Sequence, residues 1–300
     1  EYLLSIPELV GKAYDLPVRE DFDAGEIHHF WSTQQTGNGE QLNPKAGISL
    51  VGTDDADGNG VCLRFRTMLN DILTLKSGKI NITGYTNPTF VFHLKTDATS
   101  GKFKPFVENN NGLRIFLDEE PMEGLTTWTT RKYALKDYAG NGWVCLGFTF
   151  DDADGSSEQK VYMDDISIDD LKDVDAAVTL ENVPAQIEKG QSGMCTVKIR
   201  NYGDKAVSSY KVKITVGDEE IINQTMRRKL ASFGTHSYPV DIEPAIIQLG
   251  DKLTVRAEVT ADNDGVADNN VATADVVLTS PDLLPATDLA VTEAQNTHTL

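Results

Sequence analysis

Two groups of carboxylates lie near the two ends of the first half of the chain, and they are the residues best suited to do chemistry. Glu20 and Asp23 come near the start, and the pair Asp164 and Asp165 lies in a strand-like stretch of alternating residues. Regular alternation predicts Asp164 on the same side of that strand as Ile166, which should face a core. A carboxylate facing a core is costly, so Asp164 needs a cation, a hydrogen-bonding cap or a place at the end of the sheet.

A structural calcium ion is the chemistry that this pattern predicts. The two groups belong to the first and last strands of one predicted domain, and the ends of a domain commonly lie close together. A hard divalent cation would remove the repulsion between the gathered carboxylates. We expect Asp165 and Glu20 as ligands, together with Asp23, Asp164 and the loop at 54–57. In the alternative, these acids cap strand ends in water, because acidic clusters are common on so acidic a chain.

Catalysis by a pair of carboxylates is the enzyme alternative. A glycoside hydrolase needs two carboxyl groups on either side of a cleft. Asp118, Glu119 and Glu120 follow a predicted strand and are the best local candidates, but Pro121 and the neighbouring charges favour a solvated loop. The sequence contains no nucleophile motif and no phosphate-binding glycine loop, so we expect a protein that is not an enzyme.

Aromatic side chains provide a second possible site, because carbohydrate-binding surfaces often use exposed rings. Trp128 and Trp143 lie in predicted strands, and we expect both to be buried. Trp31 and Tyr85 lie beside predicted loops, and they are therefore the predicted ligand-binding residues.

The composition excludes some partners. The 300 residues carry a net charge of −19, which argues against binding to nucleic acid or to an anionic membrane surface. No run is long and apolar enough for a membrane helix, and the chain shows no signal peptide. Three cysteines, Cys62, Cys145 and Cys195, give no disulfide framework. We expect free thiols, with a Cys62–Cys145 bridge as the alternative.

Short predicted strands separated by turn residues continue along the chain and indicate an all-β fold of tandem antiparallel sandwiches. A lead-in at 1–17 precedes a first domain at 18–170, with strands predicted at 47–51, 61–68, 79–82, 89–95, 113–117, 126–133, 143–149 and 161–168. The second domain, at 174–279, has strands predicted at 175–181, 193–201, 210–216, 220–226, 235–242, 252–260 and 271–278. Their number and spacing are typical of an immunoglobulin-like sandwich. A linker and an unfinished further module occupy 280–300.

Several motifs resemble known families. The first domain contains Asp21-Phe22-Asp23, Asn87-Pro88-Thr89-Phe90-Val91-Phe92, Trp128, Tyr138-Ala139-Gly140, Val144-Cys145-Leu146-Gly147-Phe148 and Met163-Asp164-Asp165-Ile166-Ser167-Ile168. In this order they resemble the MAM-like "cleaved adhesin" domains of gingipain-haemagglutinin type, which implies a concanavalin/MAM-like jelly roll. The second domain is similar to CARDB immunoglobulin-type domains through Ile199-Arg200-Asn201-Tyr202-Gly203 and Asp268-Asn269-Asn270. The segment Pro285-Ala286-Thr287-Asp288-Leu289-Ala290-Val291 resembles the start of a fibronectin type III module.

The resemblance implies a binding or adhesion module of a secreted or cell-surface bacterial protein. Its expected partners are a glycan or a protein on a host or neighbouring cell, and adjacent modules of a longer chain. It also supports calcium in the first domain. The MAM domains of animal receptors carry paired cysteines at their edges and this chain does not, so homophilic adhesion is not carried over.

Overall fold

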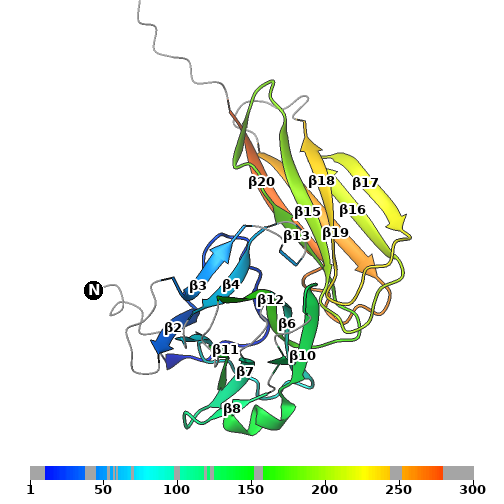
Figure 1. The fold of residues 1–300 in the computed structure, drawn as a ribbon. Helices are drawn as coiled ribbons and strands as arrows, with labels where there is room; N and C mark the ends of the chain where they lie inside the picture. The colour runs from blue at the N-terminus through cyan, green and yellow to red at the C-terminus, as the bar shows by residue number, and fades with distance from the viewer. Residues whose placement is uncertain are drawn as a thin grey trace, which may run out of the picture. The chain divides into compact units, whose positions relative to one another are not determined.

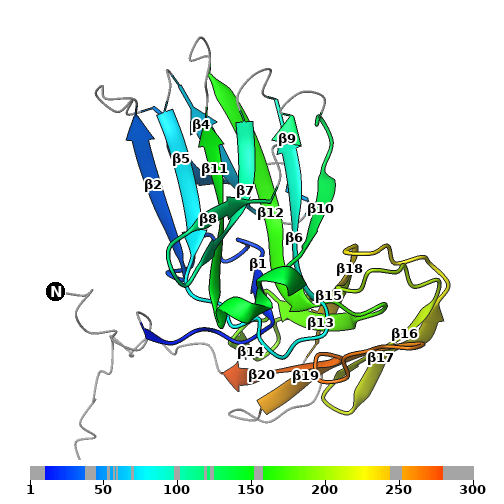
Figure 2. The same cartoon turned by 90° about the horizontal axis from the view of Figure 1, so that it is seen from below.

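The protein consists of two compact β units, shown in Figures 1 and 2. The computed structural model describes residues 11–37, 45–52, 55–56, 58, 60–68, 71–97, 102–117, 120–121, 125–151, 158–243 and 252–279. The first unit comprises Glu1–Lys172 and the second comprises Asp173–Leu300. The division falls inside the predicted joint between residues 170 and 174. The predicted linker and the predicted start of a further module, at 280–300, lie outside the described residues.

Two six-stranded sheets form the first unit. Sheet 1 has the order β10-β6-β12-β4-β3, with β1 paired to β12. Its strands are β1 (Val18–Glu20), β3 (Gly47–Val51), β4 (Cys62–Thr67), β6 (Pro88–Thr96), β10 (Thr129–Ala134) and β12 (Gln159–Asp170). Sheet 2 has the order β2-β5-β11-β7-β8, with β9 paired to β7. Its strands are β2 (Trp31–Gly37), β5 (Asp71–Ser77), β7 (Lys102–Asn109), β8 (Arg114–Phe116), β9 (Glu120–Pro121) and β11 (Val144–Asp151).

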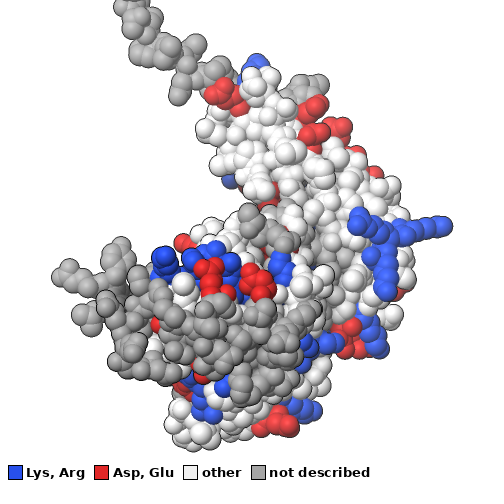
Figure 3. Space-filling model, in the orientation of Figure 1, with Lys and Arg blue, Asp and Glu red and all other residues white. Residues whose placement is uncertain are grey.

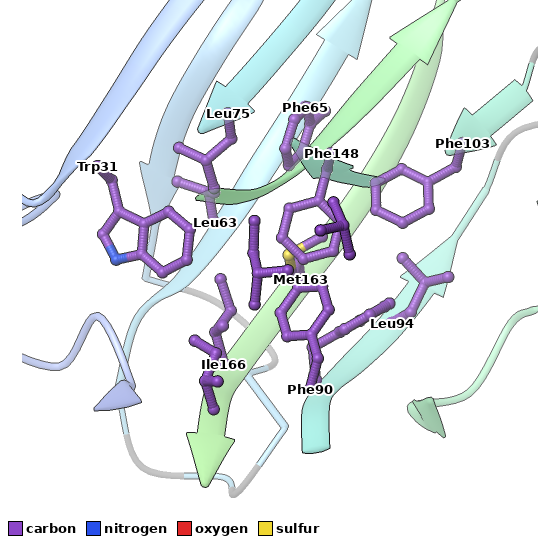
Figure 4. Packing of buried hydrophobic residues seen from close by; sticks show 14 of the residues in the cluster. Trp31, Leu63, Phe65, Leu75, Phe90, Leu94, Phe103, Phe148, Met163 and Ile166 are labelled. Carbon is purple, nitrogen blue, oxygen red and sulfur yellow. The ribbon is translucent and has the colours of Figure 1, made fainter. Parts of the chain in front are cut away.

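Phenylalanine rings fill the space between the two sheets. Phe148 of β11 lies 4.8 Å from Phe92, 5.2 Å from Phe90 and 5.3 Å from Phe103, measured between ring centroids. All four rings are fully buried, and Figure 4 shows Phe148 beside Met163 of β12 at the centre of this cluster. Alternation explains the arrangement, since every second residue of β6 and β11 is apolar and faces the opposite sheet.

A bulge divides β12 into two parts. The pairing of β12 with β6 shifts between Asp164 and Ser167, and Asp165 has a left-handed φ of 51°. Met163 on one side of the bulge and Ile166 on the other both join the core. The extra residue therefore places Asp164 on the outer face, opposite Met163, and the prediction that Asp164 shares the face of Ile166 is wrong. Bulges re-aim side chains in this way.

The second unit is also a sandwich of two sheets. A three-stranded sheet has the order β13-β15-β18, and a five-stranded sheet has the order β14-β20-β19-β16-β17. Their strands are β13 (Ala176–Glu181), β14 (Gln186–Glu188), β15 (Gly193–Asn201), β16 (Tyr210–Val216), β17 (Glu219–Met226), β18 (Thr235–Ile242), β19 (Lys252–Ala261) and β20 (Val271–Thr279). Only β14 and β20 run parallel among the described strands. The predicted all-β fold of antiparallel sandwiches is confirmed.

Helical structure contributes little to the described part of the chain. The six-residue 3-10 helix η2 (Lys136–Asn141) precedes β11 in the first unit. No helix among the described residues is long and apolar enough to cross a membrane.

Candidate functional site

The structure brings the first and last strands of the first unit side by side, as the calcium prediction required. In the pairing of β1 with β12, Glu20 lies opposite Ile166. Asp164 and Asp165 are nearly buried, with 2% and 6% of their surface exposed.

Glu20 and Asp165, the two main predicted ligands, are engaged with other groups. The amide N–H of Phe22 donates to Glu20 Oε1 at 3.1 Å. Burial raises the pKa of Glu20, and this amide hydrogen bond offsets the effect only in part. Asp165 Oδ2 lies 3.3 Å from Nδ1 of His93 on β6. These two carboxylates therefore lie in separate environments.

Asp23 and Asp164 instead meet the loop that leads into β4. The amide N–H of Val61 donates to Asp23 Oδ1 at 3.3 Å, and the amide of Ala56 donates to Asp164 Oδ2 at 2.9 Å. Gly60 of this loop packs closely against two of the carboxylates. A Cβ at this position would lie 1.7 Å from Asp23 Oδ1 and 3.2 Å from Oδ2 of Asp55.

Asp55 belongs to the predicted loop at 54–57 and is 6% exposed, whereas Asp54 and Asp57 lie outside the described residues. Burial raises the pKa of Cys62 to about 12, and the carboxylates of Asp164 and Asp55 add to the shift.

The chemistry of these carboxylates fits a hard cation, because calcium prefers oxygen ligands. Asp55 belongs to the loop that leads into β4, and Asp23 and Asp164 accept hydrogen bonds from amides of the same loop. Within the part of the chain that the structure describes, however, no group of three or more His, Cys, Asp or Glu side chains forms a metal-binding set.

The predicted ligand-binding aromatic residues do not form a platform. Trp31 is only 6% exposed and lies in the core, where its ring meets Phe30 edge-on at 5.6 Å. Its predicted surface position is wrong because Trp31 begins β2 and points between the sheets. Tyr85 is half-buried, and its hydroxyl accepts a hydrogen bond from the amide of Leu16 at 3.0 Å. This hydroxyl thus holds the lead-in against the first unit.

Trp128 and Trp143, expected to be buried, are half-exposed. The ammonium of Lys79 lies 4.6 Å from the ring centroid of Trp143, and that of Lys95 lies 5.0 Å from the ring centroid of Trp128. The expected burial is wrong because both residues immediately precede a strand residue that faces inward. Val144 follows Trp143 into the core, and Thr129 pairs with the inward-facing Leu94.

A row of side chains crosses the outer face of sheet 1, and we name it the basic aromatic row: Ser49, Arg64, Tyr162, Lys95 and Trp128. Tyr162 of β12 is paired with Arg64 of β4 on one side and with Lys95 of β6 on the other, and Arg64 is paired with Ser49 of β3. The Lys95 ammonium lies 5.4 Å from the ring centroid of Tyr162. Their neighbours Leu63, Met163 and Leu94 face the core, so this row faces away from it.

A second row beside it contains charges that compensate one another. Glu158 pairs with Arg66, and its carboxylate lies 2.8 Å from the ammonium of Lys160. Hydrogen bonds from Lys160 and Arg66 lower the pKa of Glu158. Asp97 lies 3.7 Å from the same ammonium. In the orientation of Figure 1, blue and red side chains lie together over the region of β3, β4 and β12 (Figure 3).

The predicted catalytic carboxylates cannot be placed in this geometry. Asp118 and Glu119 lie outside the described residues, and only the backbone of Glu120 is described, where it pairs with Phe103. The three cysteines are buried free thiols. Cys62 and Cys145 project from the outer faces of sheet 1 and sheet 2, because their neighbours Leu63 and Leu146 face the core between the sheets. A disulfide requires neighbouring Cβ atoms, and Cys62 and Cys145 on the outer faces of different sheets do not meet this requirement.

Solved structures are similar to parts of this chain. A cleaved adhesin domain of Lys-gingipain from Porphyromonas gingivalis is 14% identical with a TM-score of 0.39, over 51% of this chain and 97% of that one. A CARDB domain from Pyrococcus furiosus, solved with di-metal ions, is 21% identical with a TM-score of 0.32, over 36% of this chain and 91% of that one. Both families named from the sequence motifs are therefore among the similar structures.

Glycan-related structures are also similar. The glycoside hydrolase domain of Endo-D from Streptococcus pneumoniae is 16% identical with a TM-score of 0.39 over 82% of this chain, and the chain spans only 37% of that structure. Carbohydrate-binding modules solved with mannohexaose and with galactotriose match as well. No protein-family model and no curated protein matches the chain. At these identities the likeness describes the fold alone.

Sequence reasoning overlooked the basic aromatic row, although a signal for it exists. The core residues Leu63, Leu94 and Met163 fix which face of each strand is buried. Alternation then assigns Arg64, Lys95 and Tyr162 to the opposite face. Their side-by-side position follows from strand order, which local patterns do not contain.

Proposed function

We propose that the chain is a non-catalytic binding module of a secreted or cell-surface bacterial protein, and that it binds a glycan or a protein through the basic aromatic row. The carrying observation is the contact of Lys95 with the rings of both Trp128 and Tyr162 on the outer face of sheet 1. Tyrosine, tryptophan and arginine are enriched at binding hot spots because they combine a large apolar area with polar donors.

The core does not require these side chains. The fully buried Phe90, Phe92 and Phe148 fill the space between the sheets without them. Side chains on an outer face that combine rings with cations contribute little to this packing, so their combination there supports a role in recognition.

The charge of the whole chain also limits the classes of partner that the row can bind. A net charge of −19 opposes nucleic acid and anionic membrane surfaces and leaves neutral or locally charged surfaces as partners. In this proposal the second unit is a spacer that joins the binding unit to adjacent modules of a longer chain.

Calcium has a structural role in this proposal. Asp23 and Asp164, together with the loop at 54–57, would contribute oxygen ligands to the ion and fix that loop against β12. Support comes from the oxygen donors that surround Gly60 and from the burial of Asp55 and Asp164.

The proposed function is tested by binding of immobilised glycans and of host surface proteins to the 300-residue chain, compared with Trp128→Ala and Tyr162→Ala. Trp143→Ala is the matched control, because Trp143 is also half-exposed beside a lysine but lies outside the row. We expect about tenfold or greater loss of binding in the first two variants and none in the control. Equal binding by all four proteins would overturn the role of the row. Release of reducing ends from a bound glycan would instead identify a hydrolase.

A further inference from the structure

The basic aromatic row differs in charge from the rest of the chain. Acidic residues outnumber basic ones by 46 to 27 in the sequence, yet the row contains Arg64 and Lys95 and no carboxylate. Arg64 forms no ion pair within the described structure; one of its terminal nitrogens donates to Ser49 Oγ at 3.1 Å, and its Nε is buried without a hydrogen-bond partner. The guanidinium of Arg64 therefore keeps N–H donors that an external anion can accept.

Two aromatic rings lie beside the ammonium of Lys95 and contribute to its position. Its ammonium lies 5.0 Å from the ring centroid of Trp128 and 5.4 Å from that of Tyr162. The negative faces of two rings attract the ammonium and restrict a side chain that otherwise has many rotamers. A cation held in advance loses less entropy when it binds an anion.

The neighbouring second row provides an internal comparison. There Glu158 and Asp97 offset the charges of Arg66 and Lys160. The sheet therefore contains basic residues with carboxylate partners in one row and, in the next, an arginine whose described contact is a hydroxyl. This difference directs an external anion to Arg64.

We propose that the basic aromatic row binds an acidic saccharide, a sugar that carries a carboxylate or a sulfate group. This inference rests on the proposed function and names its ligand class. Arg64 and Lys95 flank Tyr162 on adjacent strands, so their backbones are separated by two strand spacings of about 4.8 Å. That span accommodates one sugar ring over Tyr162, with its anionic group within reach of the guanidinium.

The chemistry of the site selects a saccharide over other anions. Guanidinium groups bind carboxylates and sulfate-like groups through paired N–H donors. The rings of Tyr162 and Trp128 provide apolar surface for the C–H groups on one face of a sugar ring, a flat face that Asp and Glu side chains do not present. A long polyanion such as nucleic acid extends beyond the row and would meet the repulsion of the acidic chain, whereas a short acidic saccharide contacts the row alone.

The test measures binding of the 300-residue chain to tetragalacturonate and to sulfated N-acetyllactosamine, each beside its neutral counterpart, the methyl ester and the unsulfated sugar. We expect at least one acidic probe to bind about tenfold or more tightly than its neutral counterpart. The probe that binds distinguishes carboxylate from sulfate. Arg64→Gln and Lys95→Gln should each lose about tenfold, whereas Lys213→Gln, the same charge change in the second unit, should lose nothing. Arg64→Lys should keep part of the affinity that Arg64→Gln loses, because lysine keeps the positive charge but lacks the paired N–H donors of a guanidinium.

Three outcomes would overturn the inference. Equal affinity for acidic and neutral probes, with loss in Trp128→Ala, would leave the proposed function standing and exclude an acidic ligand. Equal or tighter binding of a tetra-aspartate peptide would identify an acidic peptide as the partner. No binding of either acidic probe at millimolar concentration would also exclude the ligand class. If, in addition, Trp128→Ala loses no affinity for any glycan, the proposed function would fail as well. Thermal unfolding of each variant checks that it is folded.

Discussion

Replacing Gly147 by alanine should destabilise the first unit, because this glycine lies beneath a ring on the outer face of sheet 2. Gly147 of β11 pairs with Phe106 of β7, and a Cβ there would lie 2.5 Å from that ring and 2.3 Å from the carbonyl oxygen of Leu75. The guanidinium of Arg114 covers the other side of the ring at 4.0 Å. Gly147 and Arg114 therefore both restrict the movement of the ring.

The size of the effect follows from these contacts. To reach an ordinary separation, the new methyl group must displace a backbone oxygen by about 1 Å. Overpacking of this kind costs about 1–3 kcal/mol, and the loss of glycine flexibility in a strand returns about 0.5–1 kcal/mol. The net loss of about 1 kcal/mol corresponds to a decrease in Tm of about 2–4 °C for a unit of this size.

Differential scanning calorimetry of Gly147→Ala measures this decrease, with Gly140→Ala as the matched control. Gly140 lies in η2, where a Cβ would have nothing within 4 Å, so its variant should be neutral or slightly stabilised. A Phe106→Ala background should remove the part of the cost that comes from the ring. Equal Tm values for Gly147→Ala and Gly140→Ala would refute the packing argument.

Three further outcomes concern calcium, cysteines and pH. A chelator should lower the Tm of the first unit, because it removes about 2.7 kcal/mol of stability if calcium was present at 100 times its Kd. Asp164→Asn should abolish this decrease, and Asp165→Asn should keep it. A Tm that does not change with chelator would exclude the ion. Reductant should leave the Tm unchanged, because Cys62 and Cys145 lie on opposite outer faces, and a decrease would reveal a bridge between them. Burial lowers the pKa of His236, whose Nδ1 lies 2.5 Å from the hydroxyl of Tyr210. The unfolded chain then binds the proton more readily, so the second unit should lose stability as pH falls below about 6.5 and His236→Asn should show a smaller loss; equal slopes for the two proteins would contradict this reasoning.

The strands of the second unit could be predicted closely from sequence. The predicted ranges 193–201, 210–216 and 235–242 coincide with β15, β16 and β18. These strands alternate clearly and are bounded by turn residues, so local chemistry fixes both ends. The short β14 was missed, because its three residues pair in parallel with a strand far along the sequence.

The first unit was predicted less completely, because two strands of sheet 2, β2 and β7, lack a clear local pattern. Polar residues dominate β2, and β7 contains Pro105, which argues against a strand. The carbonyl of Pro105 accepts from the amide of Leu117, so its missing N–H points to the same side. On that side β7 pairs with β8 from Phe106 onward and with β9 up to Phe103, and the proline falls in the gap between them.

The candidate site could be predicted only in part for a similar reason. That the acidic ends of the first unit would meet followed from chain topology, and the pairing of Glu20 with Ile166 confirms it. The direction of each carboxylate depends on the bulge at Asp165, which no periodic pattern contains. Local burial rules also misplaced Trp31 and Trp128, because their exposure depends on which face of a strand they occupy.

The bulge at Asp165 gives β12 two phases of alternation within one continuous strand. Val161 and Met163 follow one phase, while Ile166 and Ile168 follow the other, and all four reach the same core. Removing one residue at this point would merge the phases, so that one pair of apolar side chains would face water whichever pair kept its place. The single inserted residue therefore separates the two halves of β12. Which side chains face the core can be set in the half that carries Tyr162 without changing the half that pairs with β1.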